Sequence, residues 1–176
     1  MRFSRTISTQ LLLSAALAAC LPGCGDSAEQ QAIDELNQQG AQIVYNVEAE
    51  PIWVNLHGKE VTEATFEAIA QLPTLETLTL TRTATTDAHL QKLDTLPDLE
   101  TLDLSGTRVS DDGVTYLIRV DSLMTLALNN TNITDESLNH LRQMSRLRGL
   151  SVSGTKLSAE GLEELQRALP SCLIVN

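Results

Sequence analysis

The chain has 176 residues and a formal net charge of −11 at pH 7, and only 3% of its residues are aromatic. A chain this acidic repels phosphate backbones, which argues against a nucleic-acid partner, and it is long enough to bury the core of one domain. Its three cysteines do not make a disulfide framework or a metal site.

The first 19 residues have the pattern of an export signal. Arg2 and Arg5 precede a largely apolar run of nine residues, LLLSAALAA, at positions 11–19. This run is too short to cross a hydrocarbon core of about 30 Å as a helix. The pattern predicts that residues 1–19 are a signal peptide and that the protein is exported to the cell envelope.

The residues that follow, Leu17-Ala18-Ala19-Cys20, resemble the lipobox of bacterial lipoproteins. The resemblance implies that Cys20 receives diacylglycerol on its sulfur and becomes the mature N-terminus, tethered to a membrane by residues 20–26. Cys24 is the alternative site, although Pro22 departs from the usual lipobox. An ordinary cleavage that releases a soluble product is the other interpretation. Without residues 1–19 the chain keeps ten basic and 23 acidic residues, a net charge of −13.

Residues 27–50 are expected to cap the domain at its N-terminal end. In SAEQQAIDELNQQ, at 27–39, Ile33 and Leu36 have helical spacing, and Gly40 is a typical residue at a helix C-terminus. Residues 42–47 then have the composition of a strand.

A repeat of 24 residues occupies positions 51–170 in five copies. Most apolar positions recur in register, and the recurring positions are Leu78, Leu102, Leu126 and Leu150; Leu80, Leu104, Leu128 and Val152; Leu90, Val114, Leu138 and Leu162; and Leu93, Leu117, Leu141 and Leu165. A fixed period of this length is typical of a solenoid, in which each repeat buries its apolar face against its neighbours.

Each repeat is predicted to contain a short strand followed by a short helix. Leu102 and Leu104 alternate as in a strand with one buried face, whereas Val114 and Leu117 have helical spacing. Ser and Thr residues stand at the expected helix N-caps, and three copies place an Asp in the first helical turn, where it favours the helix dipole. A Thr column (Thr83, Thr107, Thr131, Thr155) is expected to hydrogen-bond the backbone of the adjacent coil. Pro170 ends the last helix, and residues 171–176 are expected to add a closing strand.

The pattern LxxLxLxxT followed by (T/S)D and an LxxL helix resembles the leucine-rich-repeat family, in its ribonuclease-inhibitor-like branch. The resemblance implies an α/β fold: a right-handed solenoid, shaped as a horseshoe arc, with a parallel sheet on the concave side and short helices on the convex side. The Thr column is a departure, because the commoner consensus has Asn or Cys there. Packing gives the same curvature, since helices are wider than the spacing of strands.

No catalytic constellation is evident in the sequence. His57, His89 and His140 are scattered, the last two on expected helix surfaces, and no nucleophile elbow, zinc-binding helix motif or phosphate-binding glycine loop occurs. We therefore expect a protein that is not an enzyme and that needs no cofactor and no metal.

The candidate binding surface is the concave sheet face, whose side chains alternate with the buried leucines. Its first three copies carry the one tryptophan, one histidine and one carboxylate of these columns, and the candidate residues are Trp53, Asn55, His57, Thr77, Thr79, Thr81, Thr101, Asp103 and Ser105. Toward the C-terminal end the face is expected to shrink to Gly149, Ser151 and Ser153. The sequence thus favours a protein-interaction module of unknown partner. A spacer lipoprotein without a specific ligand and a weak glycan binder are the alternatives.

Overall fold

The computed structural model describes residues 27–176, so the predicted signal peptide, Cys20, Cys24 and the linker at 20–26 lie outside the described residues. One sheet of seven strands runs through the domain in sequence order, β1 to β7. The strands are β1 (Gln42–Tyr45), β2 (Pro51–Asn55), β3 (Thr77–Thr79), β4 (Thr101–Asp103), β5 (Thr125–Ala127), β6 (Gly149–Ser151) and β7 (Leu173–Val175).

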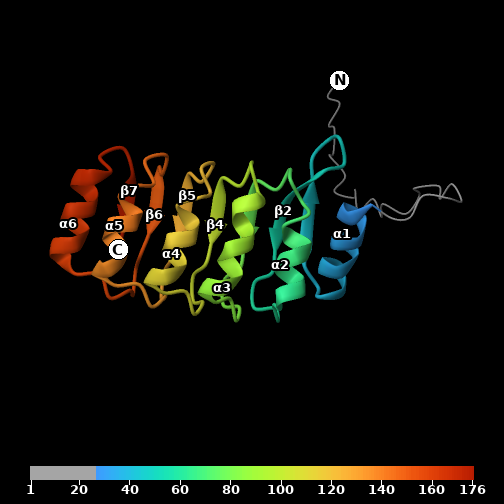
Figure 1. Ribbon diagram of the computed structural model, residues 1–176, viewed down its shortest axis with the longest axis horizontal. Coiled ribbons are helices and arrows are strands. Elements are labelled where there is room, and N and C mark those ends of the chain that lie inside the picture. The colour runs from blue at the N-terminus through green and yellow to red at the C-terminus, as the bar shows by residue number, and fades with distance from the viewer. Residues whose placement is uncertain (1–26) are drawn as a thin grey trace, which may run out of the picture.

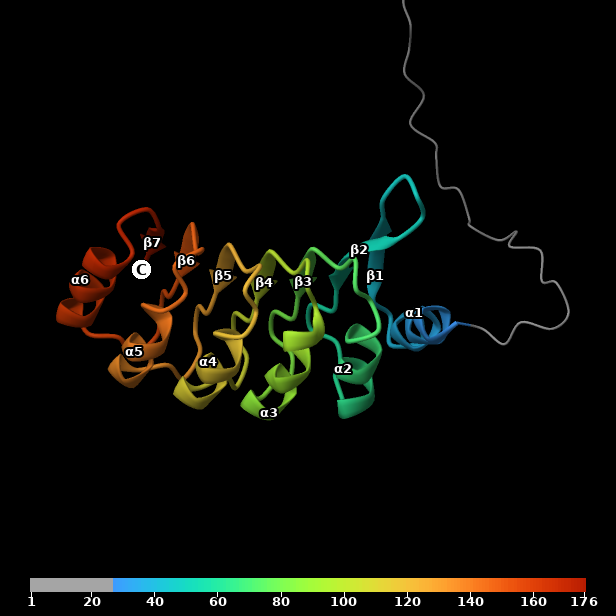
Figure 2. The ribbon, with the colours of Figure 1, turned by 45° about the horizontal axis from the view of Figure 1, so that its top comes forward.

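The helices form a second layer along one face of this sheet (Figure 1, Figure 2). They are α1 (Ala28–Gln38), α2 (Glu63–Ile69), α3 (Asp87–Leu90), α4 (Asp111–Leu117), α5 (Leu138–Leu141) and α6 (Ala159–Ala168), with 3₁₀ turns η1 (Gln91–Thr95) and η2 (Asp135–Ser137). The other face of the sheet carries no helix among the described residues (Figure 2).

Strand pairing follows the 24-residue period of the sequence. From β2 to β7 the pairs are parallel, and each partner lies 24 residues further along the chain: Trp53 pairs with Thr77, Thr77 with Thr101, and Thr101 with Thr125. The strand β1 instead pairs antiparallel with β2, where Ile43 lies opposite Val54. Equivalent residues of successive repeats therefore stand side by side in columns.

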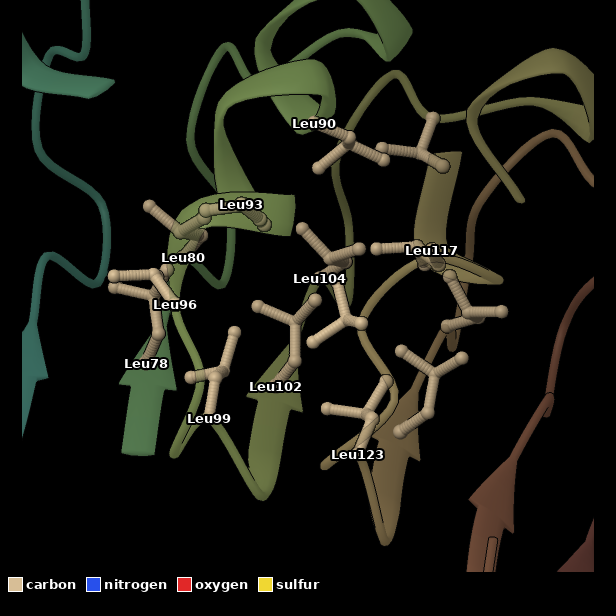
Figure 3. Close-up of a cluster of buried hydrophobic side chains, with 14 of the residues drawn as sticks. Leu78, Leu80, Leu90, Leu93, Leu96, Leu99, Leu102, Leu104, Leu117 and Leu123 are labelled. Atoms are coloured by element: carbon tan, nitrogen blue, oxygen red, sulfur yellow. The ribbon is translucent and has the colours of Figure 1, made fainter. Parts of the chain in front are cut away.

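Leucine columns fill the space between the two layers (Figure 3). Leu78 and Leu102 from the strands and Leu90 and Leu117 from the helices belong to one cluster, and all four side chains are fully buried. Because a column of one repeat packs on the same column of the next, the core is continuous along the solenoid. Cys172 is buried at the end of this core, where it packs as a small apolar residue.

The turn after each of the strands β2 to β6 places one residue in the left-handed backbone region. This column consists of Gly58, Arg82, Gly106, Asn130 and Gly154, with φ between 54° and 70°. Glycine and asparagine are the residues that tolerate this conformation best. Arg82 is the exception, and it lies against Gly106, where an added Cβ would come within 3.3 Å of the Arg82 Cγ.

The Thr column does not hydrogen-bond the adjacent coil, so that expectation was wrong. Each hydroxyl donates instead to the carbonyl three residues earlier in its own turn, as Thr107 Oγ1 does to Leu104 O at 2.6 Å. The same bond forms at Thr83 and Thr131, at 2.7 and 2.6 Å. Thr107 is 5% exposed, and this bond satisfies a hydroxyl that would otherwise be buried without a partner.

The acid in the first helical turn also does more than favour its own helix dipole. Asp87 accepts hydrogen bonds from the backbone N–H and the hydroxyl of Ser110, the N-cap of the next helix, at 2.8 and 2.7 Å. Gly113 lies over this carboxylate, and an added Cβ there would collide with it. The repeats are thus joined by side-chain bonds as well as by leucine packing.

Candidate functional site

The candidate residues on the strands form one continuous patch on the uncovered face of the sheet. Trp53, Thr77 and Thr101 pair in one row across β2, β3 and β4. Asn55, Thr79 and Asp103 pair in the next row. All six residues are half-buried, since their backbones lie in the sheet while their side chains alternate with the buried leucines.

The remaining three candidates, His57, Thr81 and Ser105, lie beyond the carboxyl ends of the strands. Thr81 and Ser105 contribute to a groove of about 620 Å³, which is lined by Thr81, Arg82, Ser105, Gly106, Asn129 and Asn130. His57 lines a smaller hollow of about 210 Å³ together with Asn55 and Lys59. The sheet patch therefore continues into two shallow hollows at this edge.

Asp103 is less free than the sequence suggested. Its Oδ1 accepts the backbone N–H of Ser105 at 2.8 Å, which fixes the turn after β4. Asn55 Oδ1 holds the N–H of His57 in the same way, at 2.9 Å. These side chains shape the rim of the patch, while Asp103 Oδ2 makes no hydrogen bond within residues 27–176.

Trp53 lies at the N-terminal end of the patch. Its indole Nε1 donates a long hydrogen bond to Thr79 Oγ1, at 3.4 Å, and the residue pairs with Val44 of β1. Val44 is 42% exposed, and Trp53 remains partly exposed beside it. The N-terminal strand thus flanks the indole without burying it, and the two residues form an apolar end to the sheet face.

A second apolar end lies on β7, where the expectation of a shrinking surface was wrong. Leu173 and Val175 pair with Gly149 and Ser151, and they are 70% and 48% exposed. The alternation in residues 172–175 contained this signal, because Cys172 and Ile174 point toward the core. The small residues of β6 are followed by two large apolar ones.

His89 is not a solvated surface residue, as its helical position had suggested. Its ring stacks on Phe66 of the preceding repeat, with centroids 4.6 Å apart and planes 7° apart. The Nδ1 atom accepts the backbone N–H of Thr86 at 3.1 Å and so caps α3. This histidine is structural.

The described residues contain no cluster suited to metal binding. Within residues 27–176 no three His, Cys, Asp or Glu side chains come together in a group that could hold a metal ion. Burial raises the pKa of the Cys172 thiol, which keeps it protonated and a poor nucleophile. In the same part of the chain, no helix combines the length and apolar character needed to cross a bilayer.

Comparison with known proteins places the fold. Neither a protein-family model nor a curated protein sequence matches the chain. Solved structures do match. A leucine-rich-repeat protein of Leptospira interrogans has 20% identity and a TM-score of 0.51, over 66% of this chain and 34% of that one. The tropomodulin C-terminal domain of Caenorhabditis elegans has 16% identity and a TM-score of 0.56, over 82% and 93% of the two chains. Actin-binding site 2 of leiomodin-1 has 15% identity and a TM-score of 0.58, over 84% and 90%.

The chain is thus a repeat solenoid of strands and short helices. Its fold is the leucine-rich-repeat fold, as the sequence pattern predicted. This chain spans only about a third of the length of the two bacterial proteins that it matches. It covers 34% of the Leptospira protein and 36% of an internalin from Listeria monocytogenes.

Proposed function

We propose that this protein is a non-catalytic protein-interaction module of the cell envelope, which binds its partner on the uncovered face of the sheet. The observation that carries the proposal is that face itself. It is continuous across all seven strands and has apolar side chains at both ends, Val44 and Trp53 at one and Leu173 and Val175 at the other. Tryptophan is one of the residues that supply most of the binding energy at protein interfaces, so Trp53 is the expected anchor of the contact. The exposed Val44, Leu173 and Val175 add apolar area that a partner can bury.

The hydroxyl-rich middle of the face suits the same role. Thr77, Thr101 and Thr125 form a row of short side chains, so a partner can approach the sheet closely between the two apolar ends. Five parallel repeats span about 25 Å of sheet, which is near the lower size limit of a specific interface. The first three repeats contribute most of the side-chain chemistry, through Trp53, His57 and Asp103.

The architecture proposed for this module is a right-handed solenoid of five repeats at 51–170. Residues 27–50 cap its N-terminal end and residues 171–176 its C-terminal end. The signal peptide at 1–19 directs export, and lipid on Cys20, or alternatively on Cys24, tethers the domain to a membrane. The net charge of −13 after processing would hold the domain away from anionic head groups.

Capture from detergent-solubilised envelope, with the lipidated full chain as bait, tests the proposal. Thr77→Arg with Thr101→Arg places two long cations on the sheet face, where neither threonine side chain makes a hydrogen bond within residues 27–176. Ala88→Arg with Asn139→Arg adds the same charge to the exposed surface of the helix layer and serves as the control. The sheet variant should lose the partner while the control retains it.

The result that contradicts the proposal is equally clear. If the wild-type bait captures no protein that the sheet variant does not also capture, the result would favour the spacer role. A sheet variant that still captures the partner, while the helix-layer variant does not, would move the site to the convex side.

A further inference from the structure

Five segments at equivalent positions of the repeat carry the chain from the helix layer into the next strand, at residues 70–76, 94–100, 118–124, 142–148 and 166–172. We call them turns, although two of them include the last residues of η1 and α6. Because β3 to β7 are parallel, all five turns lie along one edge of the sheet, which we call the helix-to-strand edge. A backbone ladder joins them: Glu100 N donates to Glu76 O at 2.9 Å, Met124 N to Glu100 O at 2.9 Å, and Arg148 N to Met124 O at 2.8 Å.

The net charges of these turns change sign at the middle turn, so that each turn before it has a partner of equal and opposite charge after it. Their net charges are −1, −3, 0, +3 and +1 in chain order. The second turn carries Asp94, Asp98 and Glu100, and the fourth carries Arg142, Arg146 and Arg148, all with exposed side chains. A chain of net charge −11 thus has one edge with an acidic half and a basic half.

Helix electrostatics do not account for this pattern. The helix-to-strand edge holds the C-terminal ends of the helices, where cations are favourable and anions are not. Ion pairs use only part of the charge, since Asp94 pairs with Arg119 at 3.5 Å and Arg142 with Glu164 at 3.6 Å. Within residues 27–176, Asp98, Glu100 and Arg146 form no salt bridge.

We propose that a second copy of this chain docks on the helix-to-strand edge, related by a two-fold axis through the turn at 118–124. A two-fold interface must be self-complementary, because the same patch meets itself in reverse order. The charge sequence of this edge fulfils that condition: the acidic turn 94–100 of each copy faces the basic turn 142–148 of the other. The proposal is independent of the sheet face and leaves it open for the partner discussed above.

The dimensions of the edge fit such a contact. The acidic and basic turns are two strand spacings apart, about 10 Å, so both symmetric charge contacts lie close to the axis. A hollow of about 290 Å³ opens beside the axis, lined by Asp121 of the middle turn and by Gln143, Ser145 and Arg146 of the basic turn among other residues, and it gives room for a polar side chain of the second copy. Because the contact is made largely by exposed charged side chains, the pairing should be reversible and depend on ionic strength.

The pairing is tested by charge-reversal variants of the full chain in non-ionic detergent. Two copies carry different tags, and self-capture is the amount of one copy that is recovered with the other. Asp98→Lys with Glu100→Lys reverses the acidic turn to a net charge of +1, and Arg146→Glu with Arg148→Glu reverses the basic turn to −1. Each double variant should lose self-capture by at least about tenfold, while the two variants should capture one another. The variant with all four substitutions should recover self-capture. If capture recovers in the mixture of the two double variants and in the fourfold variant, the double variants are folded, and their loss of self-capture is due to the lost charge complementarity.

Two further measurements complete the test. Glu136→Lys with Glu163→Lys changes the net charge as much as the first variant but lies on the helix layer, so it should keep self-capture. Raising the salt from about 0.1 M to about 1 M shortens the Debye length from about 10 Å to about 3 Å and should weaken wild-type self-capture severalfold. Any of three results would overturn the proposal. Wild-type copies do not capture one another, each double variant captures itself as well as the wild type does, or the two double variants fail to capture one another.

Discussion

The carboxylate of Asp111 joins two repeats through Thr134, 23 residues further along the chain. Its Oδ1 accepts the backbone N–H of Thr134 and its Oδ2 accepts the Thr134 hydroxyl, each at 2.8 Å. Asp87 bonds Ser110 in the same way, and Asp135 Oδ1 accepts the N–H of Ser158 at 2.8 Å. Stability of the solenoid therefore rests on polar bonds between repeats in addition to the leucine core.

Replacing Asp111 by alanine should lower the free energy of unfolding by about 1–3 kcal/mol, because it leaves a partly buried N–H and a hydroxyl without their acceptor. Asp112→Ala is the matched control. It removes the neighbouring acid from the same helical turn, but the Asp112 side chain is exposed and makes no hydrogen bond within residues 27–176, so its effect should stay within about 0.5 kcal/mol. Urea unfolding of both variants measures the difference. Equal losses would show that only the helix dipole is involved.

Asp135 gives this bridge a pH dependence. The hydrogen bonds from Ser158 favour the charged carboxylate and lower the pKa of Asp135 below its ordinary value of 3.8. A depressed pKa in the folded state contributes stability above the ordinary value and loses it as the pH falls through the folded pKa. The stability difference between wild type and Asp135→Asn should therefore be constant near neutral pH and shrink below pH 3.8. A difference that stays constant through this acidic range would contradict the assignment.

Leu102→Ala should destabilise the whole solenoid by about 2–5 kcal/mol, since Leu102 is fully buried in the middle repeat and both neighbours lose a packing surface. Hydrogen exchange should show faster opening on both sides of β4. Leu173→Ala is the control, because that side chain is 70% exposed and should change stability little. An unchanged melting midpoint for Leu102→Ala would mean that the core depends on other columns.

Cys20→Ser should abolish the incorporation of a labelled fatty acid and release the protein from the membrane fraction. Cys24→Ser should leave both unchanged. If the label persists in Cys20→Ser and disappears in Cys24→Ser, the modified residue is Cys24. Absence of label from the wild type would favour the soluble secreted product.

The leucine columns could be predicted from the sequence because burial constrains both their chemistry and their spacing. Leu102 and Leu104 alternate as on one face of a strand, and all three of Leu102, Leu104 and Leu117 of the following helix are buried. The left-handed turn residues had a signal as well, since Gly58, Gly106 and Gly154 recur in register, although Arg82 interrupts their column.

The polar bonds could not be predicted in the same way. A carboxylate in a first helical turn, such as Asp111, can interact with its own helix or with the next repeat, and sequence spacing does not distinguish the two. The hydroxyl of Thr107 likewise had several carbonyls within reach. Only the stacking of the repeats fixes which donor and acceptor meet, and the same holds for the ring of His89 against Phe66.

The most direct test of the sheet face as the binding surface uses its own fluorophore, because Trp53 is the only tryptophan of the chain. Partner isolated by capture would be titrated into the wild type and into Trp53→Phe, and the difference between the two emission spectra assigns the signal to Trp53. Binding on the sheet face should shift this emission to shorter wavelength and protect it from acrylamide quenching. A partner that binds both forms equally well and leaves the emission and quenching of Trp53 unchanged would place the interaction elsewhere on the molecule.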